Sequence, residues 1–108
     1  MDDQEFRLRA DKSMERLFRA LSDAGDDYGF EADLNSGALT VEFDEPPAKF
    51  VVSPNAPVKQ IWVSALSKSF KLGWDEAESA FVLEDTGQTL LDLMGDVVGK
   101  HIGENVEL

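Results

Sequence analysis

Acidic side chains gather in one part of the sequence with no positive charge between them. From Ala20 to Ala48 the chain has eight acidic residues and no Lys or Arg. Carboxylate oxygens are hard ligands that suit iron in both common oxidation states, and also Ca²⁺, Mg²⁺ and Mn²⁺. For any single acidic residue, a hydrated surface side chain is a simpler explanation than a metal ligand. The unbroken run nevertheless predicts weak, exposed binding of metal cations.

Five of these acids form one candidate cluster, and two more form a pair further toward the N-terminus. Glu31 and Asp33 share the outward side of a predicted strand, about 7 Å apart by the rise of a strand. Asp11 and Glu15 lie one helical turn apart. Like charges at such spacings repel, so a bound cation would stabilise the fold. The candidate metal ligands are Asp11, Glu15, Asp23, Asp26, Asp27, Glu31 and Asp33; the last five are called the acidic ridge.

A tryptophan is the candidate centre of a docking surface. In the predicted strand 60–65, Ile61 and the other apolar residues alternate with Gln60, Trp62 and Ser64. An error of one residue in the register would instead place the indole in the core. If Trp62 points away from the core, a large apolar ring in water indicates a site where a protein partner binds.

The charges are segregated along the chain. Between Lys49 and Lys71 there are four lysines and no acid, whereas Leu72 to Gly99 holds seven acids and no basic residue. This pattern indicates an acidic face and a separate, more basic sheet region, with Asn55 and Lys71 close to Trp62 in sequence. The net charge of −12 disfavours nucleic acid and anionic membranes and favours cations or a basic protein surface as partners.

Several classes of site are excluded by composition. The chain has no cysteine and one histidine, His101. It cannot ligate an iron–sulfur cluster through its own thiolates, form a Cys/His zinc site or use a cysteine nucleophile. We find no catalytic pair, no Glu-x-x-His metal set, no signal peptide and no membrane-spanning segment, and therefore expect a cytoplasmic protein that is not an enzyme.

Two helices and a series of strands are expected to position these residues. Apolar residues at spacings of three and four predict a helix from about Asp3 to Ala24, ended by Gly25. A second helix follows Gly87, with Thr86 as its candidate cap, and the apolar tail residues are expected to pack back on the domain. Strands are predicted at 30–35, 39–43, 50–52, 60–65, 68–72 and 80–83.

Short connections between consecutive strands require antiparallel pairing. The predicted fold class is α+β: one domain, residues 1–108, in which the N- and C-terminal helices pack on one face of a five- to six-stranded antiparallel sheet. The other face of the sheet would meet solvent.

The strand with the tryptophan also carries a family resemblance. Residues 57–64 read Pro-Val-Lys-Gln-Ile-Trp-Val-Ser and are similar to the Pro-x-x-Gln-Ile/Val-Trp-Leu/Val strand of the frataxin family. Residues 35–41, Asn-Ser-Gly-Ala-Leu-Thr-Val, resemble a turn and strand of the same family. With weaker matches elsewhere, the likeness covers essentially the whole chain and is to the bacterial, CyaY-type branch.

The resemblance implies the frataxin fold and weak, exposed iron binding as Fe²⁺ or Fe³⁺ at the seven candidate ligands. It also implies docking on the cysteine desulfurase and scaffold protein of iron–sulfur cluster assembly, through Trp62, Gln60, Asn55 and Lys71. A monomer is expected, with iron-dependent oligomers left open. Phe18, Arg19 and Ser22 stand where family members often carry consecutive acids, which points to fewer or weaker iron sites.

Two other functions are compatible with the same residues. The chain could be an acidic protein-interaction module whose carboxylates only keep it soluble. A self-contained ferroxidase is disfavoured because no preorganised dinuclear ligand set is present. Iron titration separates the first alternative from the leading hypothesis, and turnover by the purified protein would reveal the second.

Overall fold

The computed structural model describes all residues, 1–108, as six strands between two long helices. Along the chain the elements are α1 (Asp3–Tyr28), β1 (Glu31–Asn35), β2 (Ala38–Asp44), β3 (Pro47–Asn55), a short 3₁₀ helix η1 (Ala56–Val58), β4 (Gln60–Ala65), β5 (Lys68–Asp75), β6 (Ala80–Leu83) and α2 (Leu90–Ile102).

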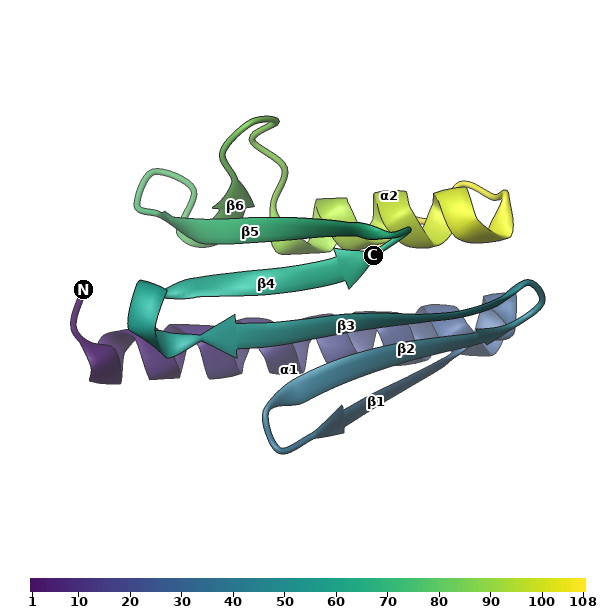
Figure 1. Cartoon of the computed structure of the whole chain (residues 1–108), viewed down its shortest axis with the longest axis horizontal. Helices are drawn as coiled ribbons and strands as arrows, with labels where there is room; N and C mark the ends of the chain where they lie inside the picture. Colours follow the sequence, from purple (N-terminus) through teal and green to yellow (C-terminus); the bar gives the residue numbers. More distant parts are fainter.

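The strands form one antiparallel sheet in which each strand pairs with its neighbours in sequence, in the order β1-β2-β3-β4-β5-β6. Both helices lie behind this sheet in Figure 1, so its near face has no covering layer. The predicted fold class, two helices on one face of an antiparallel sheet, is confirmed, with the full six strands.

The core lies between the helices and the inner face of the sheet. It consists of 23 buried apolar side chains, and no polar or charged residue is fully buried. Stability therefore rests on apolar burial, and the charged side chains remain at the surface.

The first helix is longer than predicted. It continues for another turn to Tyr28, and Gly29, with φ 80°, is the left-handed cap in place of Gly25. Gly25 is buried inside the helix, where a Cβ atom would lie 2.4 Å from the carbonyl oxygen of Phe30. The prediction failed because this glycine permits a close approach of backbone to helix rather than a left-handed turn.

The cap of the second helix was also misplaced. Thr89, not Thr86, caps α2, and its Oγ1 accepts a hydrogen bond from the Asp92 N–H at 3.2 Å. Thr86 lies in the preceding turn, where its hydroxyl contacts Gln88 at 2.9 Å. Both threonines precede the apolar pattern closely, so local sequence alone does not separate them.

The third strand is longer than the predicted 50–52 and includes Pro54. Strand β3 pairs with β2 only as far as Val52, whereas its pairing with β4 continues to Asn55. Residues 53–55 therefore have a neighbour on one side only, and proline is tolerated in such edge segments. The predicted strand 50–52 ended before Pro54 and did not allow for this.

The C-terminal tail packs on α2, as predicted. Val106 is only 6% exposed. The tail fits against two glycines of the helix: a Cβ atom on Gly95 would lie 2.9 Å from the Val106 carbonyl oxygen, and one on Gly99 would lie 2.6 Å from that of Glu104. The absence of side chains at these positions lets the tail backbone lie directly on the helix.

Candidate functional site

Trp62 points away from both helices, as predicted from the alternation of its strand. Its neighbours in β4, Ile61 and Val63, are fully buried, whereas Trp62 is 38% exposed. It stands on the uncovered face of the sheet. An exposed indole is unusual on a surface that faces only water, and large aromatic side chains are enriched where proteins bind one another.

The indole is held in place by polar neighbours. Its Nε1–H donates a hydrogen bond to Oε1 of Gln60 at 2.9 Å. The Lys71 ammonium lies 4.7 Å from the centroid of the ring, within the range of a cation–π contact. A side chain already fixed in one orientation loses less conformational entropy when a partner binds.

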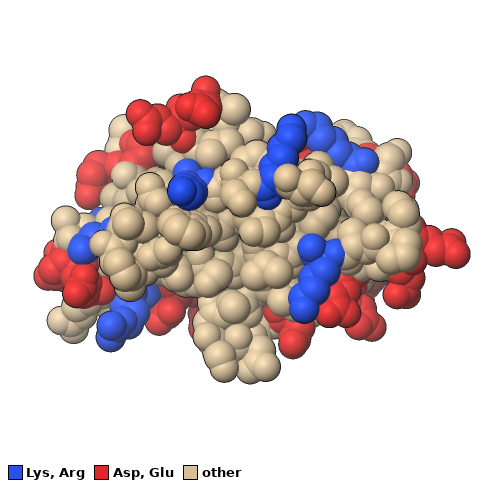
Figure 2. Space-filling view, viewed as in Figure 1, with Lys and Arg blue, Asp and Glu red and all other residues tan.

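All four predicted partner-binding residues lie on three adjacent strands. Asn55 of β3 is opposite Gln60 of β4, and Trp62 of β4 is opposite Lys71 of β5. This face is shown in Figure 2, where its centre is largely uncharged, carries isolated basic side chains and has acidic residues toward the margins. The residues thus form one surface, called the Trp62 face: Asn55, Gln60, Trp62 and Lys71.

The acidic ridge lies where α1 ends and β1 begins. Asp23, Asp26 and Asp27 are exposed in the last two turns of α1, and the longer helix places the last two inside it rather than beyond it. Glu31 and Asp33 are exposed on the outer side of β1, an edge strand. Glu31 is directly opposite Glu42 of β2, and this like-charge pair adds to the local repulsion.

None of the seven candidate ligands makes an ion pair. The four ion pairs of the molecule use the other acids Asp3, Glu5, Glu76 and Asp96. The last turn of α1 has no basic residue, although the C-terminus of a helix carries partial negative charge. The carboxylates of the acidic ridge therefore add to the negative potential of the helix end without internal compensation.

The carboxylates do not converge on a formed metal site. No three Asp, Glu or His side chains lie close enough together to hold an ion. The hard oxygen donors match the chemistry of iron, but the arrangement does not supply a complete set of ligands. A cation here would be held by one or two carboxylates, with water completing its coordination.

This arrangement of elements and side chains agrees with one family. A model of the frataxin-like domain matches residues 1–104. The chain belongs to the frataxin-like family.

Relatives of this frataxin-like domain agree with the assignment. An "iron-sulfur cluster assembly protein CyaY" of Thioalkalivibrio sulfidiphilus is 28% identical over 108 residues and is covered, like this chain, over its full length. A protein of the same name from Azotobacter vinelandii is 30% identical over 93 residues, 84% of each chain. The solved structure of the frataxin from Psychromonas ingrahamii superposes with a TM-score of 0.75 at 21% identity, over 99% of this chain and 97% of that one.

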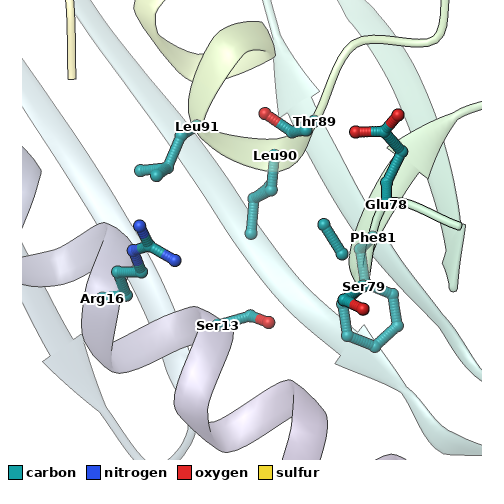
Figure 3. A pocket seen from close by; sticks show the side chains of 9 residues that line it. Ser13, Arg16, Glu78, Ser79, Phe81, Thr89, Leu90 and Leu91 are labelled. Carbon is teal, nitrogen blue, oxygen red and sulfur yellow. The ribbon is translucent and has the colours of Figure 1, made fainter. Parts of the chain in front are cut away.

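A pocket of about 270 Å³ lies between the helices of the frataxin-like domain and β6. Figure 3 shows Ser13 and Arg16 of α1 on one side of it and Leu90 and Leu91 of α2 on another. The Ser13 hydroxyl donates to the Arg9 carbonyl at 2.8 Å. No nucleophile is paired with a base among the residues that line the pocket, so it has the character of a gap between the layers.

Sequence reasoning missed a second feature of the uncovered face, a hollow of about 460 Å³ beside Gln60 and Lys71. Its floor is at Gly73 of β5, which lies opposite Gln60 on one side and Val82 on the other. The predicted strand 68–72 stopped before Gly73, whereas β5 continues to Asp75. A glycine inside a strand marks a bulge or a place where another group approaches closely, so a longer predicted strand would have pointed to it.

Neither helix of the frataxin-like domain is long and apolar enough to cross a membrane.

Proposed function

We propose that this protein acts in iron–sulfur cluster assembly by docking on the cysteine desulfurase and its scaffold protein through the Trp62 face. The docked protein modulates the desulfurase and does not itself catalyse a reaction. The name of the relatives supports the process. The observation that carries the docking surface is the exposed Trp62, fixed by Gln60 and Lys71 on a face that no helix covers.

The proposal is tested by reconstituting cluster assembly from purified cysteine desulfurase, scaffold protein, cysteine and ferrous iron. Titration with this protein is expected to change the initial rate of cluster formation saturably, because docking changes the activity of the desulfurase. Heat-denatured protein is the control. An unchanged rate at saturating concentrations of native protein would contradict the proposal.

We further propose that the acidic ridge binds iron weakly while the protein is docked or free. The support is the set of exposed, unpaired carboxylates at the negative end of α1. Binding a cation there would relieve the repulsion between Glu31 and Glu42 and between the aspartates of the helix end. Such a site holds iron where it can be exchanged, which suits a sensor or donor better than a store.

Anaerobic titration with Fe²⁺, followed by NMR, tests the iron proposal. Signals of residues 23–33 are expected to broaden first, since paramagnetic broadening acts on nuclei near the bound ion. Combined replacement of Asp23, Asp26 and Asp27 by Asn is expected to weaken this broadening strongly, while Asp92→Asn on α2 serves as the control and is expected to leave it unchanged. Uniform broadening, or none, would favour the acidic interaction module that binds no metal.

A further inference from the structure

We propose that the uncovered face of the sheet has a second recognition element, which shares Gln60 and Lys71 with the Trp62 face: the hollow over Gly73, which receives a basic side chain of the docked protein. The inference rests on the proposed function and specifies the chemistry of the partner. The lining residues that carry the argument are Gln60 of β4, Lys71, Gly73 and Asp75 of β5, Val82 of β6, and Glu84 just after β6.

Gly73 opens this hollow because it has no side chain. The backbone conformation at this position does not require a glycine. Its φ lies outside the left-handed region. A Cβ atom built on Gly73 would have nothing within 4 Å, so no neighbouring atom requires a glycine here either. Glycine weakens a strand because it has no side chain to pack. What its presence here does provide is open space between Gln60 and Val82, its neighbours on the two flanking strands.

The charge of the lining favours a cationic occupant. Asp75, Glu76 and Glu84 are at the hollow, against one basic residue, Lys71, whose ammonium is engaged with the Trp62 ring. Two of the acids have partners: Oδ1 of Asp75 accepts hydrogen bonds from the Ala77 and Glu78 N–H groups, and Glu76 lies 3.4 Å from Arg9.

Glu84 has no such partner. It is exposed, and it makes neither an ion pair nor a side-chain hydrogen bond. A lysine or arginine that enters beside the indole can place its charged end at Glu84 and its aliphatic stem on the Gly73 floor, since such side chains bury their stems while the charge stays near solvent.

Other occupants fit the hollow less well. A metal ion is disfavoured because no three acidic or histidine side chains converge. A second copy of this chain is disfavoured because each copy carries a net charge of −12. A basic side chain of another protein satisfies both the shape and the charge.

The test measures binding to purified cysteine desulfurase, alone and with its scaffold protein, by isothermal titration calorimetry. Gly73→Thr fills the hollow with a residue of high strand propensity, so it is expected to keep or raise the melting temperature. It is also expected to weaken binding at least tenfold, as blocking a central pocket does. Glu84→Gln keeps the shape and is expected to weaken binding about fivefold at low salt, the scale of one exposed ion pair.

Asp85→Asn is the matched control. Asp85 lies beside Glu84 in the connection between β6 and α2 but does not line the hollow, so the Kd of this variant is expected to stay within about twofold of that of the unchanged protein. If the unchanged protein does not bind the desulfurase, or if Trp62→Ala binds it as tightly as the unchanged protein does, the proposed function fails and the inference fails with it. If Trp62→Ala weakens binding but Gly73→Thr does not, the hollow is not part of the interface and only the inference is overturned. If Gly73→Thr weakens binding but Glu84→Gln does not, the occupant is not basic, which also overturns the inference.

Discussion

Replacing Trp62 with alanine is expected to raise the Kd for the cysteine desulfurase about 30-fold or more, corresponding to a loss of about 2 kcal/mol or more for a central aromatic residue. The free energy of unfolding is expected to fall by only about 1 kcal/mol, since the exposed ring contributes a cation–π contact with Lys71 and partial burial rather than core packing. Calorimetric titration gives the Kd, and thermal unfolding gives the stability.

Leu8→Ala is the matched control for this prediction. Leu8 is also a large exposed apolar residue, 57% exposed, but it lies on α1, in the helical layer. Its removal should leave the Kd within about twofold, as for residues outside a hot spot. Equal losses of affinity for the two variants would show that Trp62 acts through general surface hydrophobicity and not through a defined docking surface.

Replacing Gly99 with alanine is expected to lower the free energy of unfolding by about 2 kcal/mol, in the range found for overpacked sites. The added Cβ atom would lie 2.6 Å from the Glu104 carbonyl oxygen, so the tail must move away from α2. Movement of the tail also exposes Val106, which is nearly fully buried. For a domain of this size the loss corresponds to a fall of roughly 10 °C in the melting temperature.

The direction of this effect is informative because alanine is the better helix former, by about 1 kcal/mol over glycine. Gly73→Ala is the control, since a Cβ atom there meets open space, and it should leave the melting temperature unchanged or slightly higher. A Gly99→Ala protein that is as stable as the unchanged one would mean that the tail does not hold its place on the helix.

The direction of Trp62 and the two-layer architecture could be predicted because both follow from periodicity. Alternation along β4 places Ile61 inside and Trp62 outside once one face is buried. Helical spacing in α1 and α2 and the short connections between strands leave a sheet covered on one side as the simplest packing. No knowledge of distant contacts was needed for these predictions.

The features that could not be predicted depend on how neighbouring elements pack against one another, or on the absence of a side chain. Gly25 was read as a helix end because its close approach to Phe30 is visible only after β1 packs against α1. The extension of β3 through Pro54 depends on where β2 stops pairing. The hollow over Gly73 needs two flanking strands to have walls, and a missing side chain produces no periodic signal.

The acidic ridge shows the same limit within the candidate site. Sequence located the charges, and in the structure they lie in the last turns of α1 and along the strand β1 that follows it, without ion pairs. How closely they approach one another is set by the packing of an edge strand against a helix end, and they do not approach closely enough to form a complete ligand set. Iron at the ridge therefore stays a proposal for a weak, exposed site.

The most direct test of the docking surface is an NMR titration of the ¹⁵N-labelled protein with unlabelled cysteine desulfurase and scaffold protein. The Trp62 indole N–H, which donates a hydrogen bond to Gln60 in the free protein, serves as the reporter. This signal and the backbone signals of β3, β4 and β5 are expected to shift or broaden first, while those of α2 remain unchanged. Changes confined to the helices, with an unperturbed Trp62 indole signal, would contradict docking through the Trp62 face.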